Sequence, residues 1–371
     1  MSEFIGVGIG TGKNFRHLQS VKAIEFGVSM KRTFILASLL VTIVAAGLVA
    51  GCSKSGVRAG SRKDGRITGS PSDPAVAFIA QWAPSNRYVF RSEISTFAEV
   101  PRQGQAKPVP QESTLGLDYV ITVSNVNSNG SKSLELEITS VQFESTMGET
   151  MLISYDSMNK VVGTDGNAMA ERFEKIIGSK ITFQLSASNK ISNVRGISEI
   201  TNKLYNGGTA RAQTLVRRLF TPQYLRHLID LIVLPADPVR IKDSWSGQMA
   251  LNSGPLIGGI TGDVTYTFRG WQEHDQRKCA LVEFTGTVKP RGKPGGPIAN
   301  NMENGTINGK TWFDPELGIV VESISDQAAT SKGSIKWRRA GTNAPPQSYT
   351  SNFRQHTSIK LVDVEVNKPA T

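Results

Sequence analysis

The sequence predicts a mainly β protein of the α+β class, with two meandering antiparallel sheets and a few helices packed on one face. Three observations indicate this fold class. Apolar and polar residues alternate along several stretches from residue 87 onward, as they do in half-buried strands. Turn-forming residues such as Asn129-Gly130 separate these stretches. Helical spacing of apolar residues is found in short segments, chiefly between residues 210 and 233.

The first half of the folded part is expected to span residues 85–205. It is preceded by Asp73-Pro74, an N-cap residue followed by proline, which predicts a short helix over residues 75–82. A second helix is predicted over residues 168–177 and ends at Gly178. The strands of this half are predicted at residues 88–94, 117–123, 134–141, 151–155, 181–185 and 191–194.

The second half is expected to span residues 235–366. Two predicted helices, over residues 210–220 and 222–233, join it to the first half and are separated at Thr221-Pro222. Its strands are predicted at residues 239–245, 263–271, 279–288, 309–313, 318–323 and 351–366, with a loop rich in glycine, proline and asparagine at 289–305. The order of strands and loops matches that of the first half, but the spacing matches only loosely. An internal duplication and two unrelated halves both remain open.

The first 72 residues are not expected to join this fold. Lys31 and Arg32 precede an apolar run over residues 34–49, and small residues follow, which is the order of a secretory signal peptide. We expect residues 30–51 to be this signal peptide and residues 1–29 to be an extension that results from a start site assigned too early. Residues 52–72 are rich in glycine, serine and basic residues and are expected to form a flexible tether. The β-rich domain then spans residues 73–371.

The end of the signal peptide, Leu48-Val49-Ala50-Gly51-Cys52, resembles the lipobox of bacterial lipoproteins. This resemblance implies that Cys52 carries lipid, including palmitate, and that the chain is cut just before it. The lipid would then hold the protein on a membrane of the cell envelope. Ser53 resembles the pattern that sorts lipoproteins to the outer membrane, facing the periplasm. The alternative is an uncleaved spanning helix, but the apolar run is shorter than the ~20 residues that such a helix needs.

The basic balance of the chain does not indicate a nucleic-acid partner. The formal net charge is +11 at pH 7, yet the basic residues are scattered along the sequence. No basic helix and no basic motif interleaved with aromatic residues is present in the sequence. We therefore expect no binding to nucleic acid, and a mild attraction to anionic lipid head groups.

No residue pattern predicts a metal, a cofactor or a catalytic centre. The four histidines lack the spacing of metal ligands: they are His17, His227, His274 and His356. Ser157 and Lys160 match the S-x-x-K motif of penicillin-binding enzymes, but no Lys-Thr-Gly follows. Cys279 has no cysteine partner if Cys52 is lipidated, and a small buried strand residue is favoured over a reactive thiol. Turn stabilisation accounts for three aspartates, Asp156, Asp243 and Asp314.

Three further groups of residues resemble an uncharacterised family of secreted bacterial lipoproteins, a domain of unknown function. They are Tyr155-Asp156-Ser157, the element from Leu234-Pro235 through Pro238-Val239 to Asp243-Ser244-Trp245, and the turn from Phe313 to Gly318. The family often has glycine before Asp-Ser-Trp, where Lys242 stands in this chain. The resemblance covers roughly residues 85–325. It implies a β-rich exported domain and assigns no activity and no site residues.

The sequence thus leads to one main functional hypothesis and one competitor. The main hypothesis is a lipid-anchored envelope protein that acts as a non-enzymatic binding or structural module for a hydrophobic ligand or an envelope partner. Its hydrophobic-ligand version requires a large apolar pocket. The competing hypothesis is an envelope hydrolase that uses paired carboxylates, which requires two acids facing each other in a cleft. Cys52, as the lipid-attachment residue, is the single site residue that the sequence predicts.

Overall fold

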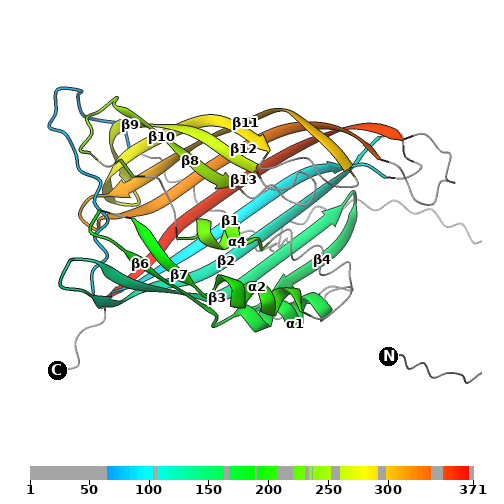
Figure 1. Ribbon diagram of the computed structural model, residues 1–371, viewed down its shortest axis with the longest axis horizontal. Coiled ribbons are helices and arrows are strands. Elements are labelled where there is room, and N and C mark those ends of the chain that lie inside the picture. Colours follow the sequence, from blue (N-terminus) through cyan, green and yellow to red (C-terminus); the bar gives the residue numbers. More distant parts are fainter. Residues whose placement is uncertain are drawn as a thin grey trace, which may run out of the picture. The chain divides into compact units, whose positions relative to one another are not determined.

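The computed structural model describes residues 65–84, 86–102, 105, 107–159, 161–162, 167–188, 190–206, 220–229, 234–235, 237–251, 260–290, 298–335 and 346–366 (Figure 1). The predicted extension, the signal peptide, Cys52 and the tether up to residue 64 lie outside these residues. The prediction of a flexible tether is wrong for residues 65–72, because they bond to the folded part: Thr68 pairs with Trp271, and the amide of Gly65 donates to the carbonyl of Glu273. Residues Gly60–Thr371 form one compact unit. None of the described helices combines the length and the hydrophobicity that crossing a membrane requires.

Thirteen strands of the described chain form one antiparallel sheet. They are β1 (Asn86–Val100), β2 (Val109–Val126), β3 (Lys132–Met147), β4 (Thr150–Asp156), β5 (Val161–Val162), β6 (Lys180–Leu185), β7 (Ile191–Arg195), β8 (Ser244–Leu251), β9 (Ile260–His274), β10 (Arg277–Pro290), β11 (Ile298–Asp314), β12 (Ile319–Ile335) and β13 (Gln347–Val366). The strand order is β5-β4-β3-β2-β1-β13-β12-β11-β10-β9-β8, and β6 pairs with β3 and β7.

The predicted fold class is confirmed, and the two predicted meanders are joined edge to edge. One meander contains β1 to β4 and the other contains β8 to β13. Strand β1 pairs with β13 from Asn86, opposite Val366, to Ala98, opposite Phe353. This pairing satisfies the backbone groups of two strands that would otherwise be sheet edges. A single sheet therefore replaces two separate ones.

In the described part of the chain, three helices pack against the inner face of the sheet, which we define as the face that carries the hydrophobic core. They are α1 (Asn167–Ile176), α2 (Ile197–Tyr205) and α4 (Pro222–His227). Phe173 of α1 contacts Phe143 of β3, and the hydroxyl of Tyr119 on β2 donates to the carbonyl of Leu228 just after α4. Figure 1 shows α4 between the arm of the sheet that contains β2 and the arm that contains β8. The predicted placement of helices on one face agrees with these contacts.

The predicted helix over residues 75–82 is wrong, because this segment is extended. Its backbone bonds to distant elements: Val76 pairs with Val239, and the amide of Gln81 donates to the carbonyl of Gly318. Phe78 inserts into the core and contacts the rings of Phe268 and Phe313. Burial of an aromatic ring and backbone pairing across the molecule outweigh the local capping signal at Asp73-Pro74.

Other element predictions have mixed outcomes. The helix predicted at 168–177 is α1, and Gly178 follows it with φ 76°. The N-cap at Thr221 is confirmed, because its side chain accepts from the amide of Tyr224. The helix predicted at 210–220 and the end of the helix at 222–233 lie outside the described residues, apart from Phe220. Helix α2 was not predicted. The loop predicted at 289–305 is wrong for residues 289–290, which belong to β10, and for residues 298–305, which belong to β11.

Candidate functional site

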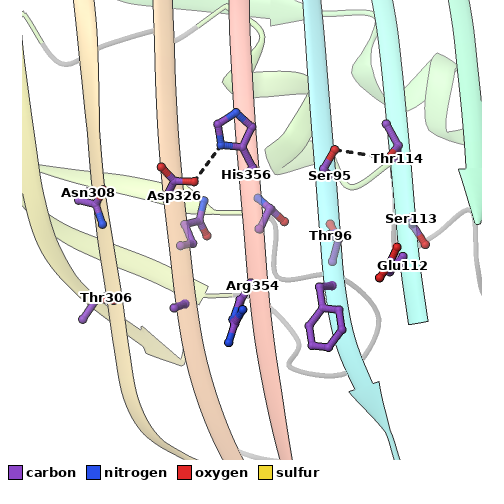
Figure 2. Close-up of a pocket in the computed structure, with 14 residues that line it drawn as sticks. Ser95, Thr96, Glu112, Ser113, Thr114, Thr306, Asn308, Asp326, Arg354 and His356 are labelled. Carbon is purple, nitrogen blue, oxygen red and sulfur yellow. Dashed lines mark hydrogen bonds and ion pairs between the residues drawn. The ribbon is translucent and has the colours of Figure 1, made fainter. Parts of the chain in front are cut away.

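The main candidate site is a groove on the outer face of the sheet, the face opposite the core and the helices. It crosses the five central strands, β2, β1, β13, β12 and β11, and therefore lies over the junction of the two meanders (Figure 2). Its cavity volume is about 490 Å³, which is in the range of sites that bind small molecules. The strand register sets the lining side chains in two rows, because directly opposed residues of paired strands share one face.

The first row is formed by polar side chains that are opposite one another on successive strands. In strand order it contains Thr114, Ser95, His356, Asp326 and Asn308. His356 Nδ1 lies 2.8 Å from Asp326 Oδ1, and both side chains are exposed. The hydroxyls of Ser95 and Thr114 lie 3.3 Å apart. The histidine ring and the two hydroxyls are thus held by neighbours in the row (Figure 2).

The second row is displaced from the first by two residues along each strand, so its side chains lie on the same face. In the same order it contains Glu112, Phe97, Arg354, Ala328 and Thr306. The Arg354 guanidinium lies over the Phe97 ring, 5.9 Å from its centre, which is the arrangement of a cation–π contact. Ala328 and Thr306 are small, so this end of the row leaves space above the sheet. The groove is therefore deepest over Ala328 and Thr306, and charged side chains line it.

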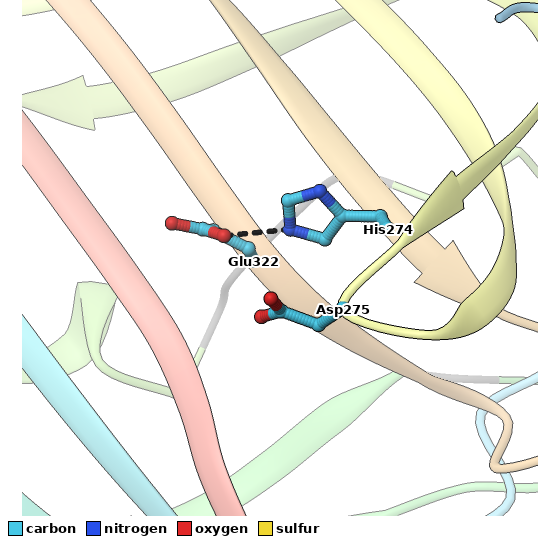
Figure 3. Close-up of side chains that lie close together, drawn as sticks. All are labelled: His274, Asp275 and Glu322. Carbon is cyan, nitrogen blue, oxygen red and sulfur yellow. Dashed lines mark hydrogen bonds and ion pairs between the residues drawn. The ribbon is translucent and has the colours of Figure 1, made fainter. Parts of the chain in front are cut away.

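A second candidate site is a charged cluster around the turn between β9 and β10 (Figure 3). Its members are His274, Asp275, Glu322 and Lys360. His274 Nε2 lies 2.6 Å from Glu322 Oε2, and these side chains are 9% and 12% exposed. Lys360 Nζ lies 2.5 Å from Asp275 Oδ2 and 3.5 Å from Glu322 Oε2. Partial burial alone would lower the pKa of Lys360, but the hydrogen bond to Asp275 and the two negative charges raise it overall.

The charged cluster is fixed in place by its surroundings. The His274 ring stacks on Trp312, with ring centres 4.2 Å apart, and the indole Nε1 of Trp312 donates to Gln272 Oε1 at 2.7 Å. Asp275 and Gln276 form the turn with φ of 47° and 66°. Residues other than glycine seldom adopt this left-handed conformation, which costs of the order of 1–3 kcal/mol each. The ion pair to Lys360 helps to hold Asp275 there.

A divalent cation would have to compete with Lys360 for the charged cluster. The donor atoms of His274, Asp275 and Glu322 lie within 4.8 Å of one another, which is close enough for a metal site in principle. The Lys360 ammonium group already contacts both carboxylates, and its raised pKa keeps it charged. The lysine thus supplies the positive charge that a metal would bring. The geometry supports an ion network in which Lys360 neutralises the carboxylates of Asp275 and Glu322.

The order Ser95, His356, Asp326 across adjacent strands resembles a catalytic triad but lacks its geometry. His356 contacts the aspartate through Nδ1, as the base of a triad does. The Ser95 hydroxyl, however, pairs with Thr114 on the other side, and no described contact joins it to the imidazole. The backbone N–H groups beside the row take part in the sheet ladder, so they are not available to form a backbone oxyanion hole.

The acids of the groove and of the charged cluster do not form the pair that the hydrolase hypothesis requires. In the groove, Glu112 is on β2 and Asp326 is on β12, and β1 and β13 lie between them. At about 4.8 Å per strand, their backbones are roughly 14 Å apart, beyond the ~6.5–9.5 Å between the carboxyls of inverting glycosidases. In the charged cluster, Asp275 and Glu322 are close together but are paired with Lys360 and His274.

The family to which the chain belongs follows from its sequence. The model of a family of unknown function, DUF6263, matches residues 129–320, just over half of the 371 residues. The chain belongs to the DUF6263 family. The match lies within the range of roughly 85–325 over which the sequence resembles a family of unknown function. DUF6263 carries no assigned activity, so membership places no role on the groove or on the charged cluster.

Comparison with curated proteins and solved structures adds no function to this DUF6263 member. No curated protein matches the sequence. A structure of lipovitellin that concerns its lipid–protein interactions has a TM-score of 0.44 and 14% identity, and covers 78% of this chain. The chain spans only 26% of the lipovitellin chain.

Two other solved structures match more weakly. A COG4313 outer membrane channel from Pseudomonas putida F1 has a TM-score of 0.16 and 8% identity, and the match covers 79% of this chain and 100% of the channel. A DUF1329 family protein from Desulfovibrio piger ATCC 29098 has a TM-score of 0.11 and 9% identity, with 78% and 88% covered. At TM-scores this low, none of the three structures indicates what this chain does.

The residues considered in the sequence have clear places in the structure, except for those outside the described part. Cys279 is a free, buried cysteine, as predicted, and burial raises the pKa of its thiol to about 12. The predicted turn roles of the three aspartates are confirmed by the backbone amides that they accept from: Met158 for Asp156, Arg240 for Asp243 and Glu316 for Asp314. Ser157 bonds to Ser140 and to the amide of Val141. Cys52 lies outside the described residues.

The sequence did not reveal the groove or the charged cluster. His274 and His356 were considered as isolated histidines, yet each contacts a carboxylate that comes from a distant part of the chain. One signal was present in the sequence: Arg354, His356 and Lys360 occur at positions of the same parity, which places their side chains on one face of a strand. That signal marks a face, and it does not tell which strands lie beside it.

Proposed function

We propose that this protein is a lipid-anchored, non-enzymatic binding module of the bacterial envelope, which binds a polar ligand in the outer-face groove. One observation carries the binding part of this proposal. Two in-register rows of mostly polar side chains line a 490 Å³ groove, and they include oriented charged groups but no nucleophile–base contact. Such an arrangement suits recognition, because it holds hydrogen-bonding groups in fixed positions.

A polar ligand is favoured over the hydrophobic ligand of the initial hypothesis. Of the 14 residues that line the groove, all but Phe97 and Ala328 have polar or charged side chains. The described inner face is packed with aromatic rings, for example Phe78 against Phe268 and Phe313. An apolar ligand would have to displace such contacts, whereas a polar ligand in the groove replaces water on exposed side chains.

The anchor part of the proposal is supported by the sequence alone. The segment from Leu48 to Cys52 resembles a lipobox, and the composition of residues 53–64, rich in serine, glycine and basic residues, suits a tether. Mass spectrometry of the membrane fraction tests it directly. We expect an N-terminal peptide that begins at acylated Cys52, and we expect Cys52→Ala to release the protein from the membrane. An unmodified Cys52 in a membrane-bound wild-type chain would refute the anchor.

The binding part is tested by blocking the groove without touching the core. Ala328→Trp places a large ring in the second row of the groove, and Thr265→Trp places the same ring on the outer face of β9, away from the groove. Melting temperatures are measured for both variants with a panel of sugars, amino acids and fatty acids. We expect polar ligands to stabilise the Thr265→Trp variant and not the Ala328→Trp variant. Equal stabilisation of both variants, or stabilisation by fatty acids alone, would contradict a polar ligand in the groove.

A further inference from the structure

We infer that the ligand of the outer-face groove is an uncharged saccharide chain that lies across the strands. This inference rests on the proposed binding function and specifies the ligand class. Three features of the groove carry it: its balance of charge, the kind of polar groups that line it, and its position on the face of the sheet.

The groove carries little net charge, which disfavours a highly charged ligand. Arg354 and Glu112 flank Phe97 in the second row, and His356 contacts Asp326 in the first row. Two carboxylates face one guanidinium and one imidazole, so no surplus of positive charge is available for a phosphate or a polyanion. The surplus of negative charge is at most one unit, which is too small to select a polycation.

The lining groups are those that recognise neighbouring hydroxyls. The carboxylates of Asp326 and Glu112 accept hydrogen bonds, the guanidinium of Arg354 donates several in one plane, and the amide of Asn308 does both. Sugar hydroxyls both donate and accept, so one sugar can use acceptors and donors on opposite sides of the groove. The small side chains of the floor allow a ring to approach the sheet.

Two of these groups are already oriented. The Phe97 ring lies under the Arg354 guanidinium at 5.9 Å, and Asp326 holds His356 through Nδ1. Restricting these side chains before the ligand arrives lowers the entropy cost of binding. The orientation matters most for a neutral ligand, because its affinity depends on hydrogen-bond geometry rather than on net charge.

The position of the groove favours a saccharide chain over a peptide strand. A peptide that adds to a sheet needs a free strand edge with unpaired N–H and C=O groups. The groove instead lies on the face of five paired strands, where the ladder uses these groups. The five strands span roughly 19 Å at about 4.8 Å per step, so a linear chain fits the two rows along their length better than a single ring does.

The test uses isothermal titration calorimetry on the full-length chain in detergent micelles. The probes are the neutral tetramers of β-1,4-linked N-acetylglucosamine and of α-1,4-linked glucose, with tetragalacturonate as the anionic comparator. Arg354→Ala removes the oriented guanidinium. The matched control is Arg91→Ala, which removes an exposed arginine that pairs with Asp118 on the same face of β1, outside the groove.

We expect at least one neutral tetramer to bind, and we expect Arg354→Ala to weaken it at least tenfold, while Arg91→Ala changes the affinity less than twofold. Because the ligand is neutral, its affinity should change little between low and high salt. Tighter binding of tetragalacturonate than of both neutral tetramers would overturn the inference.

Failure of this inference is distinguishable from failure of the proposed function. If neither neutral tetramer binds but other polar ligands still distinguish Ala328→Trp from Thr265→Trp, the groove remains a binding site and the saccharide inference is wrong. If no ligand of any class distinguishes those two variants, the proposed binding function is wrong as well.

Discussion

Two histidine–carboxylate pairs on the same face of the sheet have similar geometry and very different surroundings. His274 and Glu322 are 2.6 Å apart and 9% and 12% exposed, whereas His356 and Asp326 are 2.8 Å apart and 47% and 60% exposed. The two acids lie four residues apart on β12, a separation of roughly 13 Å along the strand. Burial, rather than the chemistry of the pair, distinguishes the two sites.

This difference in burial separates a structural role from a recognition role. The buried pair is enclosed by the stacked Trp312 ring and by Lys360, so its charges are compensated inside the protein. Buried charges need such compensation, because removing them from water costs several kcal/mol per ion. The exposed pair is already solvated, and an exposed ion pair contributes at most about 1 kcal/mol. Its side chains can exchange water for a ligand with little effect on folding.

The strongest way to test the comparison is to remove the buried acid. Glu322→Gln takes away the negative charge that faces both His274 and Lys360. We expect the free energy of unfolding to fall by about 3 kcal/mol, because His274 and Lys360 both lose the carboxylate that they contact in a largely buried site. Guanidinium denaturation measures the change. A loss below about 1 kcal/mol would mean that the buried pair stabilises the fold no more than an exposed pair does, and its structural role would be contradicted.

A smaller effect is expected from the ring that covers the buried pair. Trp312→Phe keeps an aromatic ring under His274 but removes the indole N–H that donates to Gln272. The buried oxygen of Gln272 then loses its partner, and we expect a loss of about 1–2 kcal/mol. Phe97→Leu is the matched change in the groove, where the ring is partly exposed. A larger loss for Phe97→Leu than for Trp312→Phe would contradict the assignment of roles.

Cys279 provides a pH-dependent test of burial near the charged cluster. Burial, with a contribution from the negative charge of Asp314, raises the pKa of its thiol from 9.0 to about 12. Between these values the unfolded thiol loses its proton while the folded thiol keeps it, so stability falls as the pH rises. The loss attributable to this group reaches about 1.4 kcal/mol by pH 10, one pH unit above the pKa of the unfolded thiol, by the usual linkage of about 1.4 kcal/mol per pKa unit.

The comparison of wild type with Cys279→Ala isolates this contribution. Stability is measured from pH 8 to 10 in both chains, and the wild type should show the steeper fall. Peptide mapping after iodoacetamide treatment at pH 8 gives a second measurement, in which Cys279 should react only after unfolding. Rapid labelling of the folded protein would show that this region is open to solvent.

Much of the fold could be predicted from the sequence, because local patterns reflect local physics. Alternation in 134–141 identifies β3, since every second side chain of a strand faces the core. The cap at Thr221 and the glycine at 178 were identified because capping and left-handed backbone depend on single residues. Segment 75–82 shows the limit of this approach. Its helix signal was local, whereas Val76, Phe78 and Gln81 find their partners more than 160 residues away.

The candidate site could not be predicted for the same physical reason. The first row of the groove exists only because β1 pairs with β13 in one particular register, which sets Ser95 opposite His356. A shift of one residue would turn these side chains to the other face. His274 likewise finds Glu322 across 48 residues of sequence. Pairing and register between distant strands depend on the whole sheet, so single histidines in the sequence gave no indication of their partners.

The smallest expected effect on stability, and the sharpest contrast, comes from the exposed pair. Asp326→Asn removes the charge that faces His356 but keeps the size of the side chain and one accepting oxygen. We expect the free energy of unfolding to change by less than about 0.5 kcal/mol, because both side chains of an exposed pair can bind water in place of each other. Denaturation under the conditions used for Glu322→Gln makes the two acids directly comparable. The same Asp326→Asn protein should lose affinity for the groove ligand, since the carboxylate both orients His356 and accepts from the ligand. A destabilisation as large as that of Glu322→Gln would instead show that the exposed pair also stabilises the fold, and it would contradict a role for this pair in recognition alone.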